Sequence, residues 1–144
     1  MRIFSFALVS LILLSFHANG QINTWKTLSK ITIEKRFDDV LNYEIEYPIF
    51  SEVVKKLNGT QITLEGWMIP LDELRGENYI VLSSLPFANC FFCGGAGPET
   101  VMEVFSEDKI DFTEKRVSVT GTLTINADDP LRLMYILNNA KIKD

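Results

Sequence analysis

The chain has 144 residues, of which 47% are hydrophobic and 23% charged, and its net charge is −5. These values are typical of a single globular domain with one modest core. An acidic chain lacks the clustered Lys and Arg side chains that release counterions from phosphate, so we expect no nucleic-acid partner.

The first twenty residues have the layout of a secretory signal peptide. Arg2 gives a positive start, residues 3–16 form an apolar run, and the small residues of the Ala-Asn-Gly stretch at 18–20 precede a cleavage point at Gln21. The run is shorter than the ~20 apolar residues that a spanning helix needs. We therefore expect an exported protein, periplasmic or extracellular, without a transmembrane helix after cleavage. An uncleaved anchor is the alternative.

Cleavage at this point removes the only histidine of the chain, His17. It also removes Arg2 and no acid, which takes the net charge from −5 to −6. A chain without histidine excludes Ser-His and Cys-His nucleophilic catalysis, and it excludes a His-ligated zinc or copper site.

The N-terminal segment, residues 21–47, reads as extended, because apolar and polar residues alternate at 31–33 and at 43–47. After it, Ile49, Val53 and Leu57 recur at helical spacing, and Asn58-Gly59 gives a stop signal. The pattern predicts a short amphipathic helix over residues 48–59.

From Thr60 onward the pattern changes to the period of two that is typical of strands. The predicted strands are 61–71, 79–86, 100–107, 116–126 and 131–142. Gly66 predicts a bulge or sharp bend in the first of them. The last also fits a helix begun by Asp129-Pro130, but the alternation of its apolar residues favours a strand. We expect a mainly β fold over residues 48–144, a small five-stranded OB-like Greek-key barrel with a short preceding helix, and a monomer. A small β-sandwich is the alternative.

Four stretches carry a resemblance to an uncharacterised family of small exported bacterial proteins. They are L-N-G-T-Q-I-T-L-E-G-W-M-I-P-L from Leu57, Y-I-V-L-S-S-L-P from Tyr79, C-F-F-C-G-G-A-G-P-E from Cys90 and V-S-V-T-G-T-L from Val117. The resemblance runs from Leu57 to the C-terminus, and the cysteine loop is its most specific part. It implies an OB-like fold and export, and it implies no activity. Some members carry a histidine at the cysteine loop, which this chain lacks.

The two cysteines, Cys90 and Cys93, have the C-x-x-C spacing and lie next to residues that shape a loop, Gly94, Gly95, Gly97 and Pro98. One interpretation is a local disulfide, which export permits. Closing four residues removes little entropy from the unfolded chain, about 2 kcal/mol. A second interpretation is thiol–disulfide exchange. The glycines and the proline disfavour the helix that lowers the thiol pKa in thioredoxin-like proteins.

A third interpretation is a metal site, because two thiolates two residues apart can bind a soft ion such as Cu(I) or zinc. Zinc needs four ligands, and Glu99, Met102 and Glu103 are the candidates for the additional positions. A fourth interpretation is a loop that binds a partner through Phe91 and Phe92. The sequence thus predicts an exported, non-enzymatic binding module whose loop holds copper or zinc or a local disulfide. A periplasmic thiol–disulfide oxidoreductase is the alternative.

Overall fold

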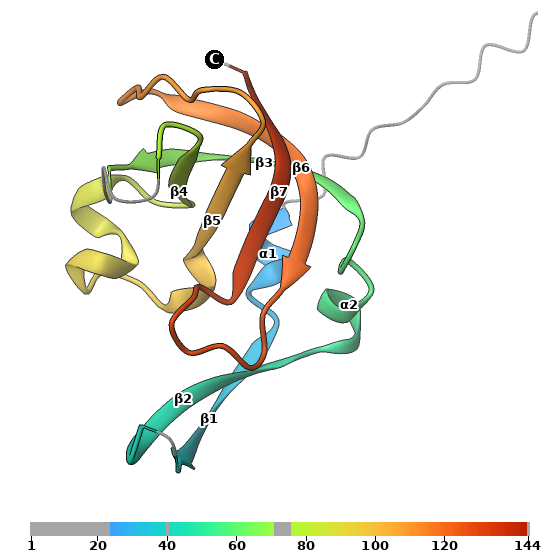
Figure 1. Ribbon diagram of the computed structural model, residues 1–144, viewed down its shortest axis with the longest axis vertical. Helices are drawn as coiled ribbons and strands as arrows, with labels where there is room; N and C mark the ends of the chain where they lie inside the picture. The colour runs from blue at the N-terminus through green and yellow to red at the C-terminus, as the bar shows by residue number, and fades with distance from the viewer. Residues whose placement is uncertain (1–23, 40, 71–75, 144) are drawn as a thin grey trace, which may run out of the picture.

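The computed structural model describes residues 24–39, 41–70 and 76–143 of the chain. It is mainly β: five strands close into a barrel, and a two-stranded arm projects from the barrel (Figure 1). The predicted signal peptide lies outside the described residues. Within the described ranges, no helix is both long enough and apolar enough to cross a membrane.

The barrel consists of β3 (Gln61–Ile69), β4 (Tyr79–Ser83), β5 (Val101–Ser106), β6 (Arg116–Ile125) and β7 (Tyr135–Lys143). Its strand order is β3-β4-β5-β7-β6, and β6 closes the circle on β3. Neighbouring strands are antiparallel except for β5 and β7, which are parallel. This order is that of a five-stranded Greek-key barrel of the OB type, so the predicted fold class is confirmed.

The strands with alternating apolar and polar residues each bury one face, which explains why the sequence pattern predicted them. Along β6, Val117, Val119 and Leu123 are buried, while the Ser and Thr residues between them are less so. The buried residues of the barrel interior form one main core cluster, which also takes in the aromatic ring of Tyr135. The predicted last strand is confirmed from Tyr135 onward, so the helical alternative for that segment is wrong.

Of the bulge or sharp bend predicted at Gly66, the bulge is wrong, because β3 keeps a regular register with β6 on both sides of this residue. A glycine is needed there for another reason: a Cβ atom would clash with the carbonyl oxygen of Ser83. The irregularity lies in β7 instead. Its register shifts against both neighbours next to Asn139, whose φ is 50°.

The predicted helix over residues 48–59 is shorter than expected. α2 (Glu52–Lys55) begins four residues later because Pro48 and Phe50 belong to the preceding strand, β2 (Tyr43–Phe50). Its buried face is also different, since Val54 and Phe50 lie in the core while Val53 is exposed. A single helical turn therefore closes the connection between β2 and β3.

A second short helix, α1 (Thr24–Leu28), lies in the segment that the sequence predicted to be extended. Leu28 is fully buried in the main core cluster, and its carbonyl accepts a hydrogen bond from the hydroxyl of Tyr135. The indole nitrogen of Trp25 donates to the carbonyl of Glu65 on β3 at 2.8 Å. The N-terminal helix is therefore anchored to the barrel by packing and by hydrogen bonds.

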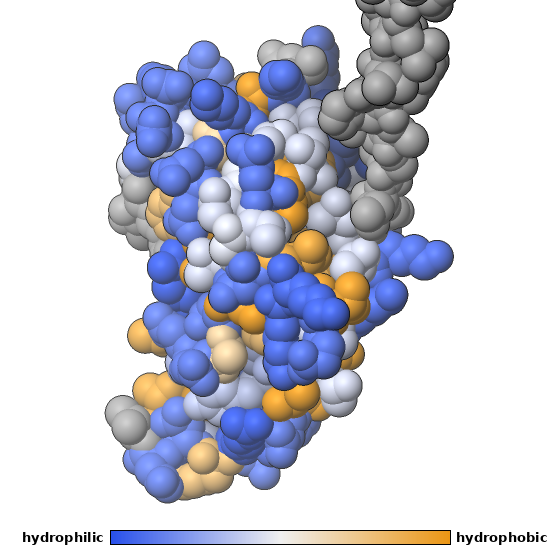
Figure 2. All heavy atoms as spheres, turned by 90° about the vertical axis from the view of Figure 1, so that its right-hand side faces the viewer, coloured by the Kyte–Doolittle hydropathy of each residue, from blue (hydrophilic) through white to orange (hydrophobic). Residues whose placement is uncertain are grey.

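The arm consists of β1 (Ile31–Asp38) paired antiparallel with β2. At its base, Ile31 and Ile33 pack against the main core cluster. Toward its tip, Phe37 and Tyr43 are exposed. Figure 2 shows apolar and polar residues interleaved on the surface of the arm, at the lower end of the molecule.

Candidate functional site

The cysteine loop, residues 84–100, connects β4 to β5 and lies on the left of the barrel in Figure 1. Its backbone is a series of three short 3₁₀ turns, η1 (Phe87–Asn89), η2 (Phe91–Cys93) and η3 (Pro98–Thr100). The loop-shaping residues act as the sequence predicted at two points. Gly94 has a φ of 78°, and a Cβ atom on Gly95 would lie 2.6 Å from the carbonyl oxygen of Asn89.

The middle turn brings the two cysteines together. The amides of Cys93 and Gly95 both donate to the carbonyl of Cys90, at 3.1 and 3.2 Å. In a 3₁₀ turn, side chains three residues apart eclipse one another. The two Sγ atoms consequently lie 3.9 Å apart, and the thiol of Cys90 donates to Cys93. Both cysteines are thiols, since a disulfide would need about 2.05 Å between the sulfurs.

The environments of the two thiols differ. Cys90 is 0% exposed and packs with Ile69, Val81 and Val101 on the outer face of the barrel, whereas Cys93 is exposed. Loss of solvation raises the pKa of Cys93, and the hydrogen bond with Cys90 raises it further. The accessible thiol is therefore a poor nucleophile at neutral pH, because the thiolate is the reactive form.

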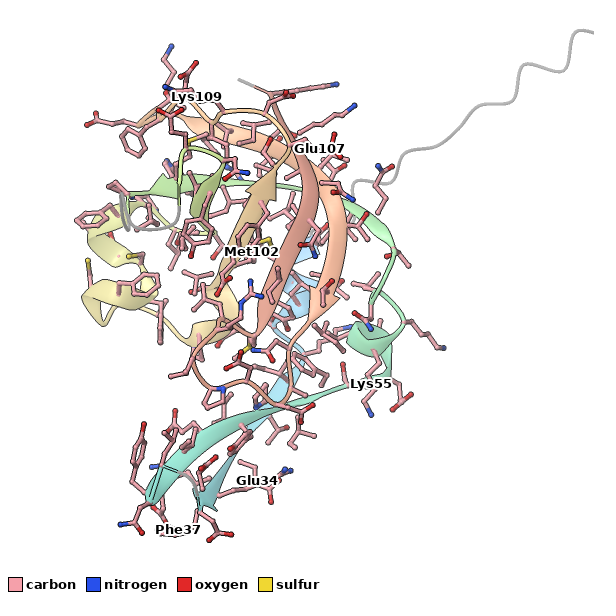
Figure 3. The ribbon with its side chains drawn as sticks, in the orientation of Figure 1. Glu34, Phe37, Lys55, Met102, Glu107 and Lys109 are labelled. Atoms are coloured by element: carbon pink, nitrogen blue, oxygen red, sulfur yellow. The ribbon has the colours of Figure 1, made fainter. Side chains whose placement is uncertain are left out.

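The structure does not bring the other predicted ligands to the sulfurs. Met102 is 0% exposed and belongs to the main core cluster. Figure 3 labels it in the middle of the barrel. Glu99 lies in η3, which contacts α1, and its carboxylate folds back over Gly97. Burial raises the pKa of Tyr135 inside the barrel, and the charge of Glu99 raises it further.

Glu103 is engaged elsewhere, in an interaction that the sequence analysis missed. It is 1% exposed, and its carboxylate accepts hydrogen bonds from Arg132 Nε at 3.1 Å and from the amide of Leu133 at 3.0 Å. The hydrogen bond to Glu103 raises the pKa of Arg132, whose guanidinium lies over the ring of Phe105. The sequence signal for this pair is an acid inside the apolar run V-M-E-V-F.

Within the described ranges, no group of three or more His, Cys, Asp or Glu side chains could hold a metal ion. The candidate site in this part of the chain therefore consists of two sulfur atoms alone. Two thiolates suffice for Cu(I), which accepts soft ligands, but they do not complete the four-ligand set of zinc.

The cysteine loop also covers the part of the barrel that OB folds use for binding. Oligonucleotides and oligosaccharides bind such barrels at the face of the second and third strands, which correspond here to β4 and β5. On their outer face, a second apolar cluster joins Val81 and Val101 to Cys90, with Phe91 and Leu133 packed against it. The loop turns Phe87 and Phe92 outward.

A comparison with known proteins found no relative, so the fold and the cysteine pair are the basis for assigning a function. No protein-family model, no curated protein and no solved structure matches this chain.

Proposed function

We propose that the protein is an exported, non-enzymatic binding module whose cysteine loop is closed by a bond between Cys90 and Cys93. The observation that carries the proposal is the placement of the two sulfurs, which are 3.9 Å apart on one 3₁₀ turn. The resemblance of the loop and the strands around it to exported OB-like proteins supports the assignment to that family and to an oxidising compartment. Oxidation there removes two hydrogens and forms the S–S bond, with a protein or small-molecule disulfide as the acceptor.

The same geometry argues against rapid thiol exchange. A reducing thiolate reaches only the exposed sulfur of Cys93, and its attack expels the thiolate of Cys90 into the apolar cluster on the barrel face. A thiolate in apolar surroundings is a poor leaving group. A closed Cys90–Cys93 bond is thus protected once formed, which favours a binding module over an oxidoreductase.

A two-thiolate site for Cu(I) is the second candidate, and the exposure of Cys93 favours it. An ion can reach Cys93 from solvent. Two thiolates alone bind Cu(I) in a linear arrangement, in which two bonds of ~2.3 Å hold the sulfurs about 4.6 Å apart. From their separation of 3.9 Å, the sulfurs move apart by about 0.7 Å to bind the ion and closer by about 1.9 Å to form a disulfide. The two candidates differ in what the site contains after export.

Native mass spectrometry of the exported protein, purified without chelators or reductants, separates these forms. A mass lower by two hydrogens, absent from the Cys93→Ser variant, is the result that the disulfide predicts. Additional mass equal to one copper ion, also lost in Cys93→Ser, would assign the second candidate. A protein with two unmodified thiols would contradict both.

A further inference from the structure

The arm has two outer edges, and their hydrogen-bonding groups follow from its register. The amide of Ser51 donates to the carbonyl of Lys30 at 3.3 Å, which makes this pair a hydrogen-bonded one. Hydrogen-bonded and non-hydrogen-bonded pairs alternate along an antiparallel ladder. The Ile33–Pro48, Lys35–Glu46 and Phe37–Glu44 pairs are therefore non-hydrogen-bonded. Their backbone N–H and C=O groups point away from the arm on either side.

The edge of β2 is closed to further pairing. Pro48 has no N–H to donate, and Glu44 and Glu46 place two negative charges along this edge. A proline and like charges are devices by which proteins protect an edge strand. Two β2 edges would bring four carboxylates together.

The edge of β1 is open. Ile33, Lys35 and Phe37 each present an N–H and a C=O outward, and no backbone hydrogen bond joins these groups to another described residue. The charges of β1 balance: Glu34 and Asp38 offset Lys35 and Arg36. Phe37 is 58% exposed near the tip of the arm, where Figure 3 labels it together with Glu34.

We propose that the β1 edge pairs with the β1 edge of a second copy of this chain, so that two arms form a four-stranded antiparallel sheet. The two-fold axis passes beside Lys35, which places Ile33 opposite Phe37 of the second copy. In this register, all three outward-pointing residues of each β1 strand become hydrogen-bonded pairs. The two barrels then lie at opposite ends of the shared sheet, because each arm joins its own barrel near Ile31. The dimer departs from the monomer that the sequence suggested.

The side chains in this register are complementary. Arg36 and Glu34 form an ion pair within their own strand, at 2.7 Å. In the dimer, Arg36 also faces Glu34 of the second copy, twice across the axis, and Ile33 of the second copy covers part of the exposed ring of Phe37. Opposite-charge and apolar cross-strand pairs each stabilise a sheet. The one like-charge contact is between the two Lys35 side chains, and each has Glu46 beside it at 3.7 Å.

The pairing also supplies the arm with neighbours that an isolated hairpin lacks. A two-stranded hairpin is marginally stable in water, and three or more strands are needed for independent stability. Only the base of this arm packs on the main core cluster, through Ile31, Ile33 and Phe50. A four-stranded sheet supplies the outer half of each arm with neighbours that its own barrel does not provide.

A pair of proline variants tests the proposal, because Lys35 and Glu46 lie directly opposite each other. Each substitution removes an outward-pointing N–H, breaks no hydrogen bond between β1 and β2, and removes the same ion pair. Lys35→Pro blocks the β1 edge, and Glu46→Pro leaves it open. The measurement is sedimentation equilibrium of the exported protein at about 1–200 µM, with circular dichroism and thermal unfolding to show that both variants fold.

The wild type and Glu46→Pro should sediment as dimers, and Lys35→Pro should weaken association about tenfold or more, because it removes two hydrogen bonds beside the two-fold axis. A wild type that is monomeric throughout this range would overturn the proposal. So would a Lys35→Pro variant that dimerises like the wild type, or a Glu46→Pro variant that loses dimerisation equally.

Discussion

The barrel and the arm are built from strands of similar length, yet they differ in what completes them. Each barrel strand has a neighbour on both sides, and one face of each is buried in the main core cluster. The arm has two strands, two outer edges and a buried base only. The comparison indicates that the barrel is stable by its own packing, whereas the arm depends on the barrel at one end and on a second copy along its edge.

The largest expected effect is that of a cavity in the barrel. Leu123→Ala removes a fully buried side chain from the main core cluster and should lower the free energy of unfolding by about 3 kcal/mol. Phe37→Ala removes a larger side chain from the arm and should change the free energy of unfolding of the monomer by less than about 0.5 kcal/mol. Urea unfolding at low protein concentration measures both. Equal losses would break the distinction between the two regions.

A smaller loss is expected from the buried ion pair on the barrel face. Glu103→Ala leaves Arg132 without its carboxylate and should cost about 2 kcal/mol, less than a wholly buried pair because Arg132 reaches solvent. The matched control is Glu65→Ala, which removes an exposed pair with Arg116 and should cost less than about 0.5 kcal/mol. If the two variants unfold at the same urea concentration, the buried pair does not hold the 126–134 loop to the barrel.

The anchoring of α1 should contribute less again. Trp25→Phe keeps most of the ring packing but removes the indole hydrogen bond to the carbonyl of Glu65, for an expected loss of about 1 kcal/mol. Thermal unfolding followed by circular dichroism gives the measurement. An unchanged midpoint would show that the indole hydrogen bond does not contribute to the anchoring of the helix.

The smallest change concerns the reactivity of the reduced cysteine loop. Because desolvation and the hydrogen bond with Cys90 raise the pKa of Cys93, the thiolate forms only at a pH above the ordinary thiol value of about 8.5. The fold favours the neutral thiol of Cys93 over its thiolate, and this preference stabilises the folded state at a pH below the pKa of Cys93 in the unfolded chain. The stabilisation is lost as the pH rises through the pKa of Cys93 in the folded protein. The rate of iodoacetamide alkylation should have its midpoint above pH 8.5 in the reduced protein. A midpoint well below that value would favour an activated, oxidoreductase-type thiol.

β3 and β6 could be predicted from the sequence because each buries one face completely, so that apolar residues recur at every second position. β4 and β5 could be recognised as short apolar runs because residues on both of their faces are buried. On β5, successive side chains point to opposite faces, which separates two of the predicted ligands. Met102 points into the barrel interior, and its neighbour Glu103 points to the outer face of the barrel. Arg132, the partner of Glu103, comes from a distant turn that no local pattern reveals. α1 was missed because a five-residue helix with one buried side chain, Leu28, is too short to show a period.

The local geometry of the cysteine pair was easier to anticipate than its environment. The C-x-x-C spacing and the following glycines predicted a loop with two nearby cysteines, and in the structure their sulfurs lie 3.9 Å apart on a 3₁₀ turn. The burial of Cys90 depends on Val81 and Val101, which belong to strands on either side of the loop. The burial of Cys90 determines whether a Cys90–Cys93 disulfide is protected from thiol exchange.

Hydrogen exchange of the oxidised and the reduced protein tests the central claim most directly. If a Cys90–Cys93 bond closes the cysteine loop over the barrel face, amides of residues 84–100 should exchange more slowly in the oxidised form, while those of β6 and β7 should not change. The Cys93→Ser variant should show the reduced pattern under both conditions. Equal exchange of residues 84–100 in the two states would contradict the claim.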